Sequence, residues 1–333
     1  MQFDKIRRRD FITLLGGAAA TRPVEVWSQV SAKKRPQIAW LSGSASKVAG
    51  LFADDFLDGM RDLGYVEGRD FDMVSRYAEG FQDRLPALTK EIISLKPDVI
   101  VAAAVNAAVP ARTATSAIPI VCPALADAVH LGLIASEARP GGNVTGIGPY
   151  VAGLPAKQMQ FAREIAPAAT RIGLLTNLHD PKAPPQRQEL ASAAKALELT
   201  IAEADVNSPV EIESAVEALA SRRVDVVIVL QTGLLLSLGK QIANLAAVNQ
   251  LPTVYGYREH VLAGGLISYG VDLRWCYRRG AYFVDKILRG IPPGELPVEF
   301  PTKMMLSVNL KTAKALDLTV APSLLATADE VIE

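Results

Sequence analysis

Short apolar runs rich in β-branched residues alternate along the chain with longer segments whose apolar residues recur every three or four positions. Phe52, Phe56 and Met60, for example, fall on one face of a predicted helix. The run at 98–102 is apolar without alternation, which is typical of a strand buried on both faces. Strands that alternate with helices of this length predict parallel sheets with right-handed crossovers, and therefore an α/β fold.

These elements form two successive sets. The expected strands of the first set lie at 37–41, 71–75, 98–102 and 118–121, with helices at 52–63 and 85–95. Those of the second set lie at 172–176, 200–204, 224–230 and 252–255, with helices at about 184–198, 210–221 and 234–248. A strand at 266–269, a helix at 275–288 and a strand at 305–308 come late. The stretch 139–153 between the sets is rich in glycine and proline, which predicts a crossing between two domains.

The beginning of the chain does not fit this pattern. Arginines at 7–9 precede an apolar run of ten residues, Phe11 to Ala20, and this run is too short to span a bilayer. The order Arg8-Arg9-Asp10-Phe11-Ile12 resembles the twin-arginine signal that directs folded proteins to export. We expect residues 1–32 to be a cleavable signal peptide of this type.

Two questions about this segment stay open at this point. Cleavage after Ala32 is preferred because small residues precede it at the expected spacing, and cleavage after Ala20 is the alternative. An amphipathic first helix of the domain would also explain the apolar run, but Gly16-Gly17 and Pro23 disfavour it.

Composition and charge narrow the class of protein. The 333 residues are half hydrophobic and carry no net charge, and the segment 1–32 holds five positive and three negative side chains, which leaves the rest at −2. This balance gives no indication of nucleic acid or of an anionic membrane surface as a partner. We expect no membrane insertion after signal cleavage. Cys122 and Cys276 are interpreted as two separately buried thiols.

The motifs of enzymes and cofactor sites are missing from the sequence. The three histidines lie far apart, and neither an HExxH nor a CxxC pattern is present, so no metal site is expected. GxSxG and Walker motifs are also missing, and Gly141-Gly142 precede a strand and therefore do not form a dinucleotide fingerprint. We expect a protein without a cofactor that is not an enzyme.

Polar and aromatic residues follow the carboxyl ends of the predicted strands. In doubly wound sheets ligands bind at this edge, and helices that start there direct backbone N–H groups toward it, which suits a carboxylate. Two facing sets of such loops fit a cleft that closes on a small molecule. The candidate ligand-binding residues are Ser42, Ser44, Asn106 and Asp127 in the first set and Asn177, Gln231, Tyr255 and Tyr269 after the glycine-rich stretch.

Each candidate also has a structural interpretation. Helix or turn capping fits the serines, the amide and the carboxylate of the first set, and burial in a core fits the two tyrosines. The amide of Asn177 equally fits a role in holding its own loop. As the only acid in the first-set loops, Asp127 is alternatively the partner of a ligand ammonium. Trp40 precedes the first loop within a strand, so we interpret it as a core residue.

Several longer stretches resemble one family. They read GMRDLGYVEGRD (59–70), SLKPDVIVA (94–102), RPGGNVTG (139–146), LPTVYGYREHVLAGGLISYG (251–270) and LPVEFPTKMMLSVNLKTAKAL (296–316). In this order they resemble the ABC-transporter substrate-binding proteins of the tryptophan/tyrosine-binding type. The family commonly has Asp-Pro where this chain has Asp127-Ala128, so the loop that holds this aspartate differs.

The resemblance implies a type I periplasmic binding-protein fold, in which two doubly wound parallel-sheet lobes are joined by three crossover strands. It implies an N-terminal lobe of residues 36–149 plus 266–291 and a C-terminal lobe of residues 150–265 plus 292–333. The segment 292–304 would cross back between them.

The resemblance also implies a function. The protein would be a monomeric periplasmic receptor that captures a small molecule in the interlobe cleft by domain closure and delivers it to ABC permease subunits. An aromatic amino acid or a related small carboxylate is the expected ligand. A ligand-sensing module that feeds a membrane sensor kinase is the alternative, and an enzyme on the same scaffold is a further one.

Overall fold

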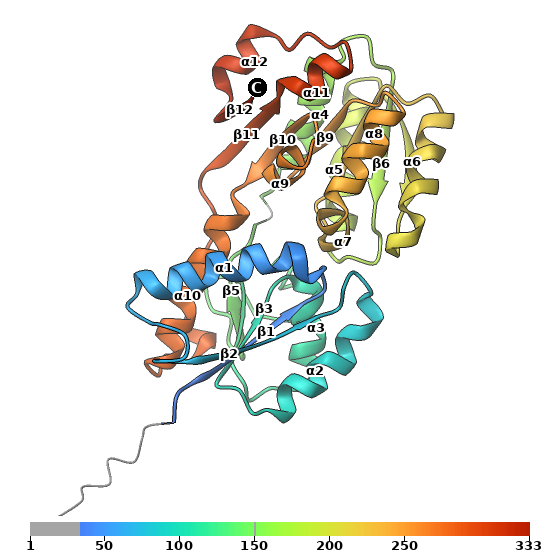
Figure 1. The fold of residues 1–333 in the computed structure, drawn as a ribbon. Coiled ribbons are helices and arrows are strands. Elements are labelled where there is room, and N and C mark those ends of the chain that lie inside the picture. Colours follow the sequence, from blue (N-terminus) through green and yellow to red (C-terminus); the bar gives the residue numbers. More distant parts are fainter. Residues whose placement is uncertain (1–33, 150) are drawn as a thin grey trace, which may run out of the picture. The chain divides into compact units, whose positions relative to one another are not determined.

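The computed structural model of the protein describes residues 34–149 and 151–333 (Figure 1). The expected signal peptide, with Arg8 and Arg9, lies outside the described residues. Within the described part of the chain, each helix is too short or too polar to cross a membrane.

The first of two sheets has five parallel strands in the order β2-β1-β3-β4-β5 (Figure 1). The helices α1 (Ser46–Asp62), α2 (Leu85–Ser94) and α3 (Val105–Ala114) belong to the same lobe, which we call the first lobe. The short 3₁₀ turn η1 (Gln82–Arg84) leads into α2. The strands are β1 (Gln37–Ser42), β2 (Asp72–Tyr77), β3 (Val99–Ala102), β4 (Ile120–Cys122) and β5 (Val144–Gly146).

Alternation along β1 gives this sheet two buried faces. Ile38 and Trp40 belong to one core cluster, which includes residues of α1, whereas Ala39 and Leu41 belong to another, with α2 and α3. All four side chains are buried, as expected for a central parallel strand.

The second sheet has seven strands in the order β12-β11-β10-β9-β8-β6-β7, and the pair β10–β11 is antiparallel (Figure 1). Its strands are β6 (Arg171–Thr176), β7 (Thr200–Asp205), β8 (Val226–Val229), β9 (Thr253–Tyr255), β10 (Ile267–Val271), β11 (Met304–Asn309) and β12 (Glu330–Ile332). The second lobe also contains α4 (Leu154–Ile165), α5 (Ala183–Ala196), η2 (Pro209–Glu211), α6 (Ile212–Ser221), α7 (Gly233–Ser237), α8 (Gly239–Val248), α9 (Arg258–Leu262), α11 (Leu310–Ala315) and α12 (Pro322–Thr327).

Late in the chain, α10 (Leu273–Leu288) returns to the first lobe and packs along α1. The approach is close, because a Cβ atom on Gly59 would overlap the carbonyl oxygen of Arg278. The Asp272 side chain caps the helix by accepting from the Trp275 N–H. A fork of hydrogen bonds from the Arg274 guanidinium to the buried Asp55 carboxylate ties α10 to α1.

The expected lobe boundaries need a correction at both ends of this return. Strand β10 was placed in the first lobe with residues 266–291, but it pairs with β9 and β11 of the second sheet. Residues 293–299 were placed in the second lobe, yet they pack on the first. The Thr145 hydroxyl donates to the Leu296 carbonyl at 2.7 Å, and Ile147 bridges to Glu299. Two crossings between the lobes therefore lie near Asp272 and at 300–303. The lobe to which each segment belongs is set by the strand or loop with which it pairs, and not by the segment that precedes it in the sequence.

Periodicity predicted most strands to within two residues, but it missed several short elements. Helix α3 was not expected, because Pro110 lies inside it and its alanines give little contrast between faces. The expected helix 234–248 is two helices, α7 and α8, which meet at Leu238. Elements such as β5, α4 and β12 were also missed.

Candidate functional site

The loops that follow the strands of both sheets meet at one place, which we call the central chamber. Its lining includes Trp40, Ser42, Phe52 and Tyr277 from the first lobe and Lys182 and Tyr257 from the second. The chamber has a volume of only about 20 Å³. That is room for about one water molecule.

Aromatic rings form one wall of the central chamber. Phe52 stacks on Tyr277 with ring centroids 4.5 Å apart, and Trp40 lies 5.8 Å from Tyr277. The Tyr277 hydroxyl is fixed by donation to the Ala103 carbonyl at 2.6 Å. Trp40 is fully buried, and its indole N–H has no hydrogen-bond partner. The wall therefore offers apolar area together with one unused donor.

Serine hydroxyls and a helix start provide polar groups on the other side. The Ser44 N–H donates to the Ser42 hydroxyl at 3.1 Å. The Ser44 hydroxyl donates to the Gly233 carbonyl at 3.2 Å, which joins the first lobe to the second. Thr232 caps α7 by accepting from the Leu235 N–H. Of these three contacts, the Ser44–Gly233 hydrogen bond joins the two lobes at the chamber, and the other two order the loops on each side.

Lys182 brings a buried positive charge to the central chamber. Its side chain is only 4% exposed, and its ammonium lies 3.9 Å from the Asp180 carboxylate. Burial alone would lower the pKa of this ammonium, but Asp180 and the hydrogen-bonded Tyr257 hydroxyl outweigh burial, and the pKa lies above its ordinary value. Lys182 therefore stays protonated at neutral pH.

Asp180 itself is committed to its own lobe. One of its carboxylate oxygens accepts from the Lys182 N–H at 3.0 Å, and the other accepts from the Gly233 N–H at 3.1 Å. The carboxylate thus orders the loop after β6 and the start of α7. It also stabilises the positive charge of the Lys182 ammonium electrostatically.

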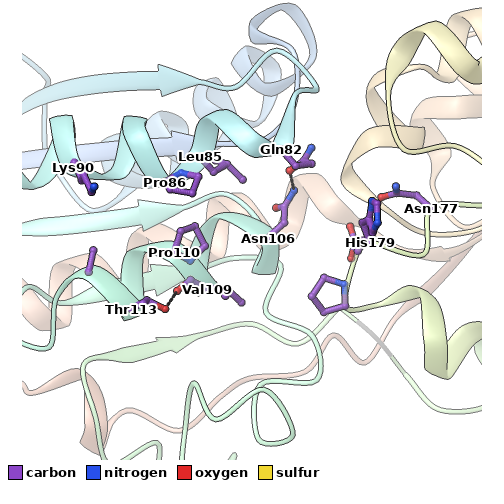
Figure 2. Close-up of a pocket in the computed structure, with 13 residues that line it drawn as sticks. Gln82, Leu85, Pro86, Lys90, Asn106, Val109, Pro110, Thr113, Asn177 and His179 are labelled. Carbon is purple, nitrogen blue, oxygen red and sulfur yellow. Dashed lines mark hydrogen bonds between the residues drawn. The ribbon is translucent and has the colours of Figure 1, made fainter.

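A second and larger cavity, which we call the outer groove, runs between α2 and α3 of the first lobe and the loop after β6. Its volume is about 580 Å³, and Leu85, Pro86, Val109 and Pro110 contribute apolar surface. Figure 2 shows Gln82 and Asn106 of the first lobe facing Asn177 and His179 of the second.

The amides of the outer groove are partly engaged. The Asn106 amide N–H donates to the Gln82 side-chain oxygen at 2.6 Å, and the Asn106 oxygen is buried without a partner. The Asn177 amide donates to the Val206 carbonyl at 2.7 Å and so holds its own loop.

The predicted site residues fall into separate groups. Ser42 and Ser44 line the central chamber, and Asn106 and Asn177 line the outer groove. Asp127 is exposed, has a left-handed backbone (φ 52°) and lines another pocket, next to Glu137 and Phe300. The structure does not bring Asp127 to the two serines.

The other three predicted residues are packed within the second lobe. The Gln231 amide donates to the Gly256 carbonyl at 2.9 Å, and a Cβ atom on Gly256 would overlap its side chain. The ring of Tyr255 is fully buried and stacks on His260 at 4.6 Å. Tyr269 packs on Phe161 with centroids 5.0 Å apart. These side chains line neither the central chamber nor the outer groove.

Sequence reasoning missed Lys182, Tyr257 and Tyr277, and it took Trp40 for a core residue only. Tyr257 lies two positions beyond Tyr255, past the end of the strand, where a side chain reaches the edge of the sheet. Tyr277 had no signal in its own neighbourhood, because α10 approaches the chamber from far along the chain. Lys182 did have a signal in the sequence, because it ends the short polar loop HDPK (179–182) between a predicted strand and a predicted helix.

Both cysteines are buried and unpaired, in agreement with the interpretation as separate thiols. Burial raises the pKa of the Cys122 thiol to about 12, so it stays protonated and unreactive. In the two described ranges, no three side chains of the metal-ligating types come together as a site.

Comparisons with known proteins agree with this architecture. The sequence model of a family described as ABC transporter substrate binding protein matches residues 47–332. A tyrosine-binding protein of Clostridioides difficile is 26% identical over 263 residues, which are 79% of this chain and 75% of that protein.

Two solved structures share the fold. A conserved domain protein from Vibrio cholerae is 25% identical, with a TM-score of 0.82. The ABC domain from Streptococcus pneumoniae in complex with L-Trp is 24% identical, with a TM-score of 0.83. In each case 90% of this chain and 100% of the other are covered. The expected fold of two parallel-sheet lobes of the type I periplasmic binding proteins is thereby confirmed.

Proposed function

Because this chain belongs to the family of ABC transporter substrate-binding proteins, we propose that it is the periplasmic receptor of an importer. Its ligand is an aromatic amino acid or a related small carboxylate, captured between the lobes. The observation that carries this proposal is the central chamber, where an aromatic wall and a buried cation meet at the carboxyl ends of both sheets. A relative named as tyrosine-binding and a similar fold in complex with L-Trp support this class of ligand.

Capture requires the lobes to separate. A chamber of about 20 Å³ is far below the roughly 300 Å³ or more that ligand pockets usually have. The Ser44–Gly233 hydrogen bond forms only when the lobes meet, so it belongs to the closed arrangement. The crossings between β5 and α4, at Asp272 and at 300–303 would act as the hinge. The ligand shifts the equilibrium by as much as its affinity for the closed form exceeds that for the open form.

The predicted site residues take different parts in this proposal. Ser42 and Ser44 orient the ligand in the central chamber, while Asn106 and Asn177 line its approach along the outer groove. Gln231, Tyr255 and Tyr269 act indirectly, by holding the loops and strands of the second lobe. A role for Asp127 in pairing with a ligand ammonium stays a prediction.

The closed form would be recognised by permease subunits in the inner membrane, and the protein would act as a monomer and without catalysis. Export would follow the twin-arginine route, because the arginine pair is present at Arg8 and Arg9. Fractionation of cells that produce the double variant Arg8→Lys, Arg9→Lys tests this route, since continued export would contradict it.

The proposed ligand class is tested directly by calorimetry on the purified protein. Titrations with L-tryptophan, L-tyrosine, L-phenylalanine and aromatic carboxylic acids are expected to give a saturable heat with at least one of them. Native mass spectrometry of the protein as purified reveals a ligand that remains bound. If no aromatic compound binds and a sugar or a branched-chain amino acid does, the proposal is wrong.

A further inference from the structure

The charge of the central chamber is one-sided. Among its described lining residues Lys182 is the only charged one, and none is an acid. The Asp180 carboxylate, 3.9 Å from the Lys182 ammonium, already accepts from the Lys182 and Gly233 backbone N–H groups. Asp127, the acid that the sequence offered as partner for an ammonium, lines a different pocket. An ammonium group in the chamber would therefore meet a buried like charge.

The hydrogen-bonding capacity of the chamber is also one-sided. The Lys182 ammonium carries three donors, and its protein partners are the Tyr257 hydroxyl and Asp180 at 3.9 Å, which is too far for a hydrogen bond. The buried indole N–H of Trp40 has no acceptor. Two buried donors with capacity left over call for a ligand with acceptor oxygens, because an unpaired buried donor is costly.

We propose that the central chamber selects an aromatic carboxylate that lacks an ammonium group, and that Lys182 pairs with its carboxylate. This inference rests on the proposed function and narrows its ligand class. The aromatic part of the ligand packs against Phe52 and Tyr277, and its carboxylate lies toward the second lobe. A full amino acid would place its ammonium beside Lys182 with no acid in the lining to compensate.

Three matched ligands separate the contributions of the two charged groups. 3-Phenylpropanoate carries the ring and the carboxylate, L-phenylalanine adds an ammonium, and 2-phenylethylamine keeps only the ring and the ammonium. The corresponding indole series is 3-(indol-3-yl)propanoate, L-tryptophan and tryptamine. We expect the propanoates to bind at least tenfold more tightly than the amino acids in calorimetry, and the amines not to bind.

A Lys182→Met variant tests the assigned residue. Loss of a charge-assisted hydrogen bond is expected to weaken propanoate binding by roughly ten- to hundredfold. Lys182→Arg should retain part of the affinity, and Lys195→Met, at an exposed position of α5 that lines neither cavity, should leave it unchanged. Because Lys182→Met leaves the buried Asp180 uncompensated and could unfold the loop, the double variant Asp180→Asn, Lys182→Met is measured beside it, and the same loss is expected.

The outcomes distinguish this inference from the function on which it rests. If the amino acids bind as tightly as the propanoates or more tightly, the inference is wrong and the proposed function stands. The inference is also overturned if both Lys182→Met and the double variant Asp180→Asn, Lys182→Met bind the propanoates as tightly as the wild type does. If none of the six compounds binds, both the inference and the aromatic ligand class are wrong.

Discussion

The central chamber and the outer groove lie side by side at the loop after β6 and differ in almost every property. The groove has a volume of about 580 Å³ and the chamber about 20 Å³. Lys90 and Asn106 of the groove are exposed or already bonded within their own lobe, whereas the chamber contains a buried ammonium and an unpaired indole N–H. Unsatisfied buried donors therefore favour the chamber as the candidate site, whereas open volume alone would favour the groove.

Truncation of a ring in the aromatic wall tests whether the lining of the chamber belongs to the hydrophobic core. Tyr277→Ala is expected to lower the free energy of unfolding by about 3–5 kcal/mol, because it removes a buried ring and the hydrogen bond to Ala103. Denaturant unfolding measures this loss. Trp275→Ala is the matched control on the same helix, since Trp275 is 41% exposed, and its loss should stay below about 1 kcal/mol. Equal losses would mean that the chamber wall is not core.

A buried acid in α9, close in sequence to the chamber residue Tyr257, gives the stability of the protein a pH dependence. Glu259, two residues after Tyr257, has one carboxylate oxygen buried without a partner, and burial raises its pKa to about 7. A carboxyl with a raised folded-state pKa stabilises the protein at low pH, and that stability is lost as the pH rises from about 4.5 through about 7.

Glu259→Gln removes this titration. Relative to the wild type, the variant should gain about 2 kcal/mol in unfolding free energy between pH 5 and pH 8. Because both proteins keep His260, whose lowered pKa acts in the opposite direction, the difference between them isolates Glu259. A difference independent of pH would mean that Glu259 is ionised in the folded state throughout this range.

The Ser44 hydroxyl tests the contact that joins the lobes at the chamber. Ser44→Ala removes the hydrogen bond to the Gly233 carbonyl, worth about 1 kcal/mol, so the open fraction should rise by up to about fivefold. Energy transfer between one dye on each lobe reports this fraction. Ser46→Ala, at the first residue of α1, is the control and should leave the signal unchanged. A Ser44→Ala signal equal to that of the wild type would exclude this contact from closure.

Substitution of Asp127 is expected to have the smallest effect on ligand binding. Because it lies in a separate pocket, Asp127→Asn should change the affinity for L-phenylalanine and for 3-phenylpropanoate by less than about twofold. Calorimetry with both ligands provides the measurement. A selective loss of L-phenylalanine binding would restore the role that the sequence suggested for this acid, and it would contradict the one-sided charge of the chamber.

The sequence predicted the strands well, and also the edge of the sheet where the chamber lies, because both depend on local patterns. Apolar runs identified β1 and β3, and the end of β1 pointed to Ser42 and Ser44, which line the chamber. The same reasoning chose Tyr255 over Tyr257, because it could not tell which side of the sheet a residue at the end of a strand would face.

The remaining site residues depend on contacts between distant segments. Tyr277 reaches the chamber only because α10 returns to α1, and Lys182 is buried in a chamber lined by residues of both lobes. A lysine in a polar loop normally indicates solvent exposure. Its burial is a property of the assembled tertiary structure, and no local pattern carries it.

The return of α10 also sets the order in which the protein acquires its structure during synthesis. Arg274 and Asp55 pair across 219 positions, and the α1 face of the first lobe has no cover until α10 has left the ribosome. At typical translation rates of about 5–20 residues per second, that face stays open for roughly 10 to 45 s. Synthesis of the first lobe begins before that of the second, but the lobe is completed only when α10 has been made. The nascent chain therefore exposes the apolar face of α1 to holding chaperones for most of its synthesis.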